Sequence, residues 1–247
     1  MSTMSKKAWD NFIGQINAIT LKLRDSGCVD PFFRGHSNPR WALYPSIARK
    51  ENKQYDEERL HAIFQSMGGH LMSNDTVCWE YLFYMQHHGL PTRLLDWTEN
   101  FGAALYFAVK NNSRGAVIWI LDPYSLNKIT LSKDQVISSR ELDNDYCDYF
   151  NIEESDVYGK FPGDLIAMIG SFKSIRMRSQ RSVFTFHKNL KKPLDKLFPS
   201  VVHKVSISKE ALPEAKSYLQ LFGINEFTLF PDLDGLGRHI KEIEKYS

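Results

Sequence analysis

The chain has 247 residues, of which 43% are apolar and 24% are charged, and its formal net charge is +2. This composition excludes collagen-like and disordered chains, and so small a net charge gives no argument for nucleic-acid binding by itself. No stretch approaches the roughly 18 apolar residues that span a bilayer, and the first residues lead into an amphipathic pattern rather than an apolar signal core. We therefore expect no contact with a membrane. The three cysteines lie far apart without a CxxC pair, so we expect a reducing, cytoplasmic environment.

Apolar spacing predicts two helices in the first third of the chain. Between Trp9 and Ile16, apolar residues recur at three- and four-residue intervals, which is typical of a helix with one buried stripe. Residues 31–34 read as a short strand that ends at Gly35. The stripe pattern returns at residues 60–71, after an acidic segment that suits the first turn of a helix.

The rest of the chain mixes strands with helices. Thr98 is a good N-cap for a helix whose alanines, at residues 103–108, imply close packing against a sheet. Strands are predicted from β-branched and aromatic residues at 116–121, 183–186, 201–207 and 224–230, before a final helix at 236–246. There is no regular βαβ alternation, internal repeat or linker. We therefore predict one α+β domain with a mixed central sheet and flanking helices, preceded by an N-terminal helix within residues 1–29.

Residues 85–98 hold the densest set of polar groups. Gln86, two histidines, Thr92, Arg93, Asp96 and Thr98 flank a turn at residues 89–91. A helix start after Thr98 would offer N–H groups to a phosphate. His87 and His88 are adjacent, so both cannot enter one pocket from a regular helix, and Asp96 has the alternative of capping Thr98 or pairing with Arg93 to hold the turn. No HxxxH, HExxH, GxSxG, P-loop or GxGxxG spacing occurs, and we predict no metal.

Two further segments carry cations. In Phe33-Arg34-Gly35 the guanidinium could bind an anion bidentately while the glycine admits a ligand close to the backbone. The alternative is a structural ion pair of Arg34. The segment 176–184 combines Gln180 with several arginines and an aromatic residue, which suits nucleic acid or a cationic rim around an acidic small ligand.

These segments together resemble the FRG domain family, whose Phe-Arg-Gly motif stands here at residues 33–35. The similarity continues through WALYPS at 41–46, Arg49, QHHGLPTRLLDWT at 86–98, ALYFA at 104–108, residues 180–184 and LFPDLDG at 229–235. It implies an FRG domain over residues 30–247.

A more distant similarity links the same pattern to ADP-ribosyltransferases. In that superfamily an aromatic-Arg-Gly strand holds the phosphates of NAD, and a Ser/Thr-containing strand leads into a helix rich in Ala and Phe. Phe33-Arg34-Gly35 resembles the first element, and residues 92–98 with 103–108 resemble the second. A glutamate on a later strand is the third element. Gln180 falls near its place but carries no charge to stabilise an oxocarbenium-like centre.

The resemblance implies an NAD-binding protein that transfers ADP-ribose or consumes NAD, acting as a bacterial toxin or anti-phage effector. NAD would be the substrate, and a protein or nucleic acid would be the target. The alternative is a non-catalytic module that binds a nucleotide, a nucleic acid or a protein. The implied ligand-binding residues are Phe33, Arg34, Gly35, Gln86, His87, Thr92, Arg93 and Thr98. The candidate catalytic residues are Glu80, His88, Asp96 and Gln180, with Glu226 as a further candidate carboxylate.

Overall fold

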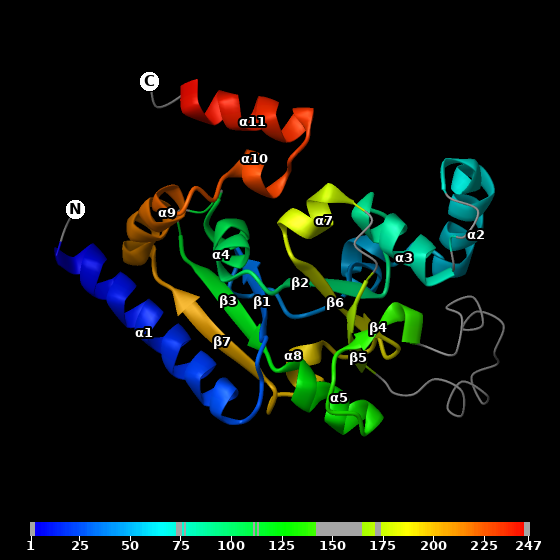
Figure 1. The fold of residues 1–247 in the computed structure, drawn as a ribbon, viewed down its shortest axis with the longest axis horizontal. Coiled ribbons are helices and arrows are strands. Elements are labelled where there is room, and N and C mark those ends of the chain that lie inside the picture. The colour runs from blue at the N-terminus through cyan, green and yellow to red at the C-terminus, as the bar shows by residue number, and fades with distance from the viewer. Residues whose placement is uncertain are drawn as a thin grey trace.

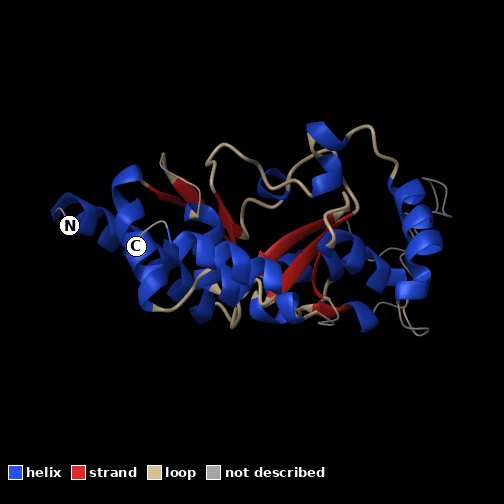
Figure 2. Ribbon diagram, turned by 90° about the horizontal axis from the view of Figure 1, so that it is seen from above, coloured by secondary structure: helices blue, strands red, loops and turns tan. Residues whose placement is uncertain are grey.

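The computed structural model describes residues 3–72, 76, 78–110, 112, 114–141, 165–170 and 174–244. These residues form a seven-stranded mixed sheet with helices on both faces, as the α+β prediction required (Figure 1). Seen from above, helices crowd one side of the strands, and loops with short helices cover much of the other (Figure 2). Within the described ranges, no helix is both long enough and apolar enough to cross a membrane.

The strands and helices alternate irregularly along the chain. The strands are β1 (Phe32–His36), β2 (Leu94–Thr98), β3 (Ala116–Leu121), β4 (Ile137–Ser138), β5 (Leu165–Ile169), β6 (Ser182–His187) and β7 (Val202–Ile207). The helices are α1 (Thr3–Asp25), α2 (Glu57–Gly68), α3 (Cys78–His87), α4 (Phe101–Val109), α5 (Pro123–Leu131), α7 (Ile175–Ser179), α8 (Leu194–Leu197), α9 (Leu212–Leu221), α10 (Glu226–Leu229) and α11 (Leu233–Glu244).

The sheet is divided near its middle. Its order is β4-β5-β6-β2-β1-β3-β7, and every pairing is antiparallel except the one between β4 and β5. Strand β1 pairs with β3 at five positions, and β2 pairs with β6 at five. Between β1 and β2 the register contains a single pair, Phe33 with Thr98. The two halves of the sheet therefore separate on one side of this pair.

Three apolar clusters cover the faces of the two halves, because side chains alternate along each strand. One cluster joins Phe33, Ile118 and Ile120 to α1, α4 and α9. On the opposite face, Phe32 and Trp119 pack with Trp97 and with residues of α5 and α8. A third cluster lies between α3, α7 and strands β2, β5 and β6. The first and third clusters thus each support one half of the sheet, whereas the second joins the two halves across the split.

Several sequence predictions are confirmed here, and others are wrong. The predicted helix at residues 9–16 lies within α1, and the strands at 116–121, 183–186 and 201–207 are present as β3, β6 and β7. Strand β1 continues through Gly35 to His36, so the expected end at Gly35 is wrong. The final helix begins at Leu233, earlier than predicted, and the end of its predicted span, residues 245–246, lies outside the described residues.

The predicted strand at residues 224–230 is wrong. This segment forms α10, because the Asn225 side chain accepts a hydrogen bond from the backbone N–H of Thr228 while the Thr228 hydroxyl accepts one from the backbone N–H of Asn225. This reciprocal capping box starts a helical turn that apolar content alone does not reveal.

The apolar stripe predicted for residues 60–71 is also only partly buried. Asp56 caps α2 as its acidic start suggests, but Ile63, Met67 and Leu71 are exposed. The residues that α2 buries fully are Glu57 and His61.

Candidate functional site

A large cleft opens where β1 and β2 separate. Its volume is about 1220 Å³, above the roughly 300–1,000 Å³ of an ordinary small-molecule pocket. Its walls come from β1, the segment 37–53, the end of α3, β2, α4, α7, β6 and residues 190–191. Cations predominate among the charged lining residues: Arg34, Arg40, Arg49, Lys50, Lys53, Arg176 and Lys191 stand against Glu51 and Asp96. The charged lining of the cleft is therefore mainly positive.

Arg34 reaches across the split from β1 to β2. Its Nε donates a hydrogen bond to His36 Nε2 at 2.9 Å, and its Nη1 donates to the backbone carbonyl of Asp96. The Asp96 carboxylate is 3.9 Å from Nη1, too far for a close ion pair. The guanidinium side chain is only 17% exposed. Burial lowers the pKa of Arg34 to about 10, with the attraction of Asp96 opposing the shift, so the group stays charged at neutral pH.

His36 holds the guanidinium in this position. Burial, followed by the charge of Arg34, lowers the pKa of His36 to about 3. The imidazole is therefore neutral at physiological pH, and one ring nitrogen is available to accept the Nε–H of Arg34. Trp119 lies on the other side of the ring, with its Nε1 at 3.3 Å from His36 Nδ1. The histidine thus orients Arg34 without adding a second positive charge.

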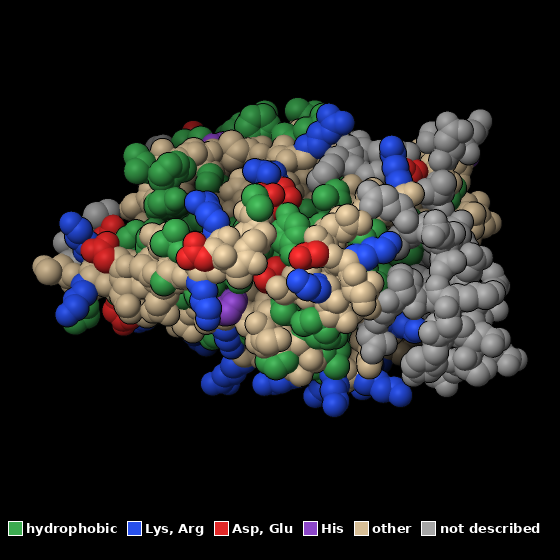
Figure 3. Space-filling view, turned by 60° about the horizontal axis from the view of Figure 1, so that its bottom comes forward, with side chains coloured by type: hydrophobic (Ala, Val, Ile, Leu, Met, Phe, Trp, Pro, Cys, Tyr) green, Lys and Arg blue, Asp and Glu red, His purple; other side chains and the backbone are tan. Residues whose placement is uncertain are grey.

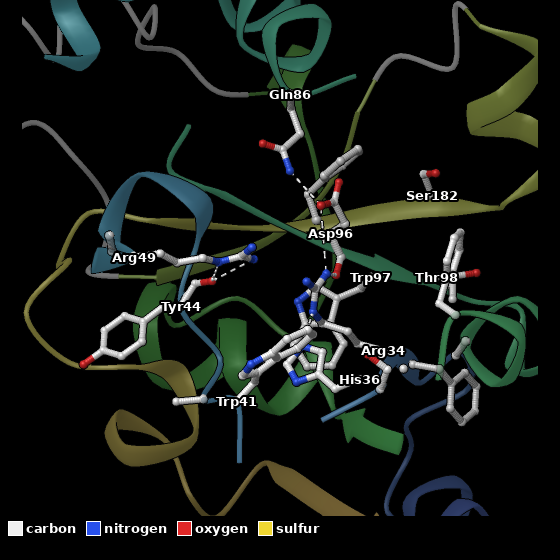
Figure 4. A pocket seen from close by; sticks show the side chains of 18 of the residues that line it. Arg34, His36, Trp41, Tyr44, Arg49, Gln86, Asp96, Trp97, Thr98 and Ser182 are labelled. Carbon is white, nitrogen blue, oxygen red and sulfur yellow. Dashed lines mark hydrogen bonds and ion pairs between the residues drawn. The ribbon is translucent and has the colours of Figure 1, made fainter. Parts of the chain in front are cut away.

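Asp96 is held from the opposite wall. The Thr92 hydroxyl accepts a hydrogen bond from the backbone N–H of Leu94 and donates to Gln86 Oε1 at 2.5 Å. This fixes the amide of Gln86 so that its Nε2 donates to Asp96 Oδ2 at 2.6 Å. The Asp96 side chain is nevertheless 52% exposed. In Figure 4, Gln86 reaches toward Asp96 while Arg34 and Arg49 point toward the same centre. A carboxylate with a fixed orientation therefore faces the cleft beside Arg34.

The remaining wall is formed by β6, α4 and α7. Thr98 donates its hydroxyl hydrogen bond to the backbone carbonyl of Gln180 at 2.5 Å, and the Gln180 side chain donates to the carbonyl of Leu229 at 3.0 Å. Arg176 lies over the ring of Phe230, 4.6 Å from its centroid. Burial and then the charge of Arg176 lower the pKa of His87, which lines the cleft from the end of α3. The ring of His87 is therefore neutral at physiological pH.

The helix after β2 starts differently from the prediction. Asn100, not Thr98, is the N-cap of α4, and its side chain accepts hydrogen bonds from the backbone N–H groups of Gly102 and Ala103. Thr98 instead ends β2 and accepts from the backbone N–H of Asn100. The cap already occupies the N–H groups of Gly102 and Ala103, so this helix start has fewer free donors than predicted, and the phosphate site there stays a prediction.

Gly35 has a packing role at the floor of the cleft. A Cβ added there would lie 1.9 Å from the backbone oxygen of Ala104 and 2.8 Å from the nitrogen of Ala108. Only glycine lets α4 approach β1 this closely. Phe33, two residues earlier on the same face, packs its ring against Phe101 at 5.8 Å.

Several predicted site residues lie away from the cleft. Arg93 pairs with the buried Glu57 and donates to the carbonyl of Lys188, so it braces the chain near α2. His88 is exposed and does not line the cleft. Glu80 is buried on α3, outside the lining.

Glu226 does not line the cleft either. It is 2% exposed and binds Tyr106, Lys110 and Arg238. These contacts fasten α10 to α4 and α11. Of the candidate carboxylates, Asp96 alone lines the cleft within the described part of the chain.

The sequence reasoning gave no role to His36 or to the segment 40–53. The prediction that the strand ends at Gly35 leaves His36 outside it, whereas in the structure His36 is the last residue of β1 and its ring accepts a hydrogen bond from Arg34. Trp41 and Arg49 belong to the stretch on which the family similarity rests, and this was the available signal. Within the described ranges, no group of three or more His, Cys, Asp or Glu side chains gathers as a metal site would require.

The fold and the cleft define a mixed α/β protein with a divided sheet and a cleft lined mainly by cations at the division. The FRG domain family matches residues 30–116, so this chain carries an FRG domain. The match runs from just before β1 to the first residue of β3 and includes Arg34, Asp96 and Thr98. The extension of the domain to residue 247 stays a prediction. No curated protein and no solved structure matches the chain.

Proposed function

We propose that the cleft binds NAD or a closely related dinucleotide, and that the protein breaks the bond between ribose and nicotinamide as an ADP-ribosyltransferase or NAD glycohydrolase. The observation that carries this proposal is the guanidinium of Arg34. It is largely buried in a cationic cleft, and no described residue accepts a hydrogen bond from its Nη2. A pyrophosphate would supply the negative charge and the hydrogen-bond acceptors that the guanidinium of Arg34 lacks.

The order of the strands supports the same proposal. Strands β6, β2 and β1 are neighbours, so Gln180, Thr98 and Arg34 line one cleft although they are far apart in sequence. Arg34 and Thr98 stand in the segments that resemble the first and second elements of ADP-ribosyltransferases, and Gln180 falls near the place of the third, the glutamate, which has no clear counterpart in this chain. The cleft is also large enough for a dinucleotide, and the exposed Phe107 offers an apolar ring surface to one of its rings.

Asp96 is the residue best suited to assist the reaction. In the proposed step a nucleophilic hydroxyl or water attacks C1′ of the nicotinamide ribose. The bond from C1′ to the ring nitrogen breaks, its electron pair leaves with nicotinamide, and the proton of the nucleophile passes to the carboxylate. Because Gln86 fixes one carboxylate oxygen, the group would also stabilise the positive charge that develops at C1′. Gln180 lacks a charge and would contribute only contacts.

The first experiment incubates the purified chain with NAD and measures nicotinamide release, together with binding by calorimetry. Arg34→Ala should weaken NAD binding about 10- to 150-fold, because a hydrogen bond to a charged group contributes about 1.5–3 kcal/mol. Asp96→Asn should retain binding and lose turnover. Arg24→Ala, an exposed change on α1, is the control for removal of one cation. Absence of both turnover and binding in the wild-type chain would refute the proposal.

A second candidate is a module that binds the dinucleotide without cleaving it. It is favoured by the neutral Gln180, whose amide is already engaged by Leu229. Binding of NAD by the wild-type chain without any nicotinamide release would select this candidate. An NAD-consuming activity would suit a toxin or an anti-phage effector, and that role belongs to the first candidate alone.

A further inference from the structure

We infer that the mouth of the cleft binds single-stranded nucleic acid. The cleft mouth comprises Arg40, Trp41, Tyr44, Lys50, Lys53 and Lys191, all of which line the cleft. One consequence of this binding rests on the proposed function: the bound strand would be the target presented to a nucleotide held at Arg34. Binding of the strand itself follows from the mouth residues.

The charges of the cleft mouth are uncompensated. Arg40, Lys50, Lys53 and Lys191 are exposed, and none of them forms an ion pair with a residue in the part of the chain described here. Among the described residues 37–53, Glu51 is the one acidic residue that lines the cleft. Since the whole chain carries a net charge of only +2, four free cations at one opening are a local excess. Such an excess attracts a polyanion.

Lys and Arg side chains are unevenly distributed over the surface as well. On the face in Figure 3 several of them lie side by side along the lower border, while others are scattered over the rest of the face among acidic side chains.

Aromatic side chains distinguish nucleic acid from other polyanions. Trp41 is 54% exposed at the cleft mouth, where its indole is accessible to a planar partner. It is not a loose side chain, because its backbone N–H donates to the carbonyl of Asn38 and its ring contacts that of His36. Tyr44 is anchored nearby, with its backbone carbonyl accepting from Arg49 and its hydroxyl 3.5 Å from the carbonyl of Lys191. Fixed aromatic rings among cations are the arrangement on which unpaired bases stack.

The geometry favours a single strand over a duplex. Stacking on Trp41 needs the face of a base, which a double helix covers with the neighbouring base pairs. The size of the cleft also leaves room for a second occupant, since about 1220 Å³ exceeds what one small ligand fills. A nucleotide at Arg34 and an unstacked base at the mouth would then share the cleft.

The test measures fluorescence anisotropy of a labelled oligonucleotide of about 12 thymidines or uridines with the full chain, over a range of salt concentrations. Four phosphate contacts predict that the logarithm of the affinity falls with the logarithm of salt with a slope of about −3. Lys50→Glu with Lys53→Glu should abolish binding. Lys6→Glu with Lys7→Glu on α1 makes the same charge change away from the mouth and should retain most of it. Trp41→Ala should weaken binding about tenfold without flattening the salt slope.

The outcomes separate this inference from the proposed function. Arg34→Ala should impair NAD binding and leave oligonucleotide binding nearly intact. Lys50→Glu with Lys53→Glu should abolish oligonucleotide binding, whereas NAD binding, to whose cationic cleft both lysines also contribute, should fall far less than it does in Arg34→Ala. If the wild-type chain binds NAD but no oligonucleotide, the inference is wrong and the proposed function stands. If a duplex or a poly-glutamate peptide competes as well as the single strand, the inference is wrong because only charge is recognised. Oligonucleotide binding without NAD binding would refute the proposed function alone.

Discussion

Gly35→Ala is expected to destabilise the fold because of helix packing. The added Cβ would lie 1.9 Å from the oxygen of Ala104 and 2.8 Å from the nitrogen of Ala108, both backbone atoms of α4. A backbone cannot rotate away as a side chain can. Helix α4 would therefore have to move by at least about 1 Å, although Ala103, Leu105 and the other buried residues of this helix are packed in a core cluster.

The cost of Gly35→Ala can be placed at about 3 kcal/mol. Overpacking a core typically costs about 1–3 kcal/mol, and a clash with main-chain atoms belongs at the upper end of that range. For a chain of this size each kcal/mol lowers the melting temperature by about 2–4 °C. We therefore expect melting about 6–12 °C below that of the wild-type chain, measured by circular dichroism and checked by urea unfolding.

Gly14→Ala is the matched control for this change. Gly14 is an exposed position inside α1, and a Cβ added there has no atom within 4 Å. Alanine should stabilise the helix by up to about 1 kcal/mol, since glycine is the weaker helix former. If Gly35→Ala melts like the wild-type chain but loses NAD binding, the packing argument is refuted, and the glycine serves instead to admit a ligand to the backbone.

Two further predictions concern buried charges. His187 is fully buried, and burial lowers its pKa to about 3, so below pH 6.5 the unfolded chain binds a proton that the native chain does not. His187 alone should therefore lower the free energy of unfolding by up to about 1.4 kcal/mol per pH unit between pH 6.5 and pH 3. His36 adds a similar contribution, so His187→Gln should reduce the slope measured in urea titrations by that one share. An unchanged slope would contradict the lowered pKa of His187. Glu226→Gln should cost about 2 kcal/mol at pH 7, less than for a fully buried pair because Lys110 and Arg238 are partly exposed. Its hydrogen bonds to Lys110, Tyr106 and Arg238 lower the pKa of Glu226 against the effect of burial, so the difference from the wild-type chain should shrink as acid protonates the wild-type carboxyl. A difference that persists at pH 3 would show that shape, not charge, matters at this position.

The sequence predicts those elements whose signal is local. The apolar stripe of α1 and the β-branched run of β3 are properties of consecutive residues, so spacing and propensity suffice. The segment 224–230 misleads because its apolar residues favour a strand, whereas two reciprocal hydrogen bonds between Asn225 and Thr228 decide for a helical turn. Thr98 misleads similarly, since Asn100 stands two residues later and is also an excellent cap.

The candidate site is predictable in part for a different reason. Arg34, Asp96 and Gln180 stand in motifs that the sequence reveals, but only the strand order brings β1, β2 and β6 side by side. Arg93 and His88 belong to the same motif as Asp96 and still lie outside the cleft, because Arg93 pairs with Glu57 and His88 is exposed to solvent. The cations of the cleft mouth follow no regular spacing in the sequence, and only the fold brings them together.

The split of the sheet explains why an arginine stands at position 34. Beyond the pair Phe33–Thr98, β1 and β2 no longer exchange backbone hydrogen bonds, and the carbonyl of Asp96 receives one from the Arg34 side chain instead. A second N–H of the same guanidinium is taken by His36, and Nη2 is left for a ligand. Only a planar group with several donors can serve these three directions together, whereas the ammonium of lysine is a compact charge on a flexible stem. Arg34→Lys should therefore retain the positive charge and still lose most of the NAD binding, a result that charge attraction alone would not produce.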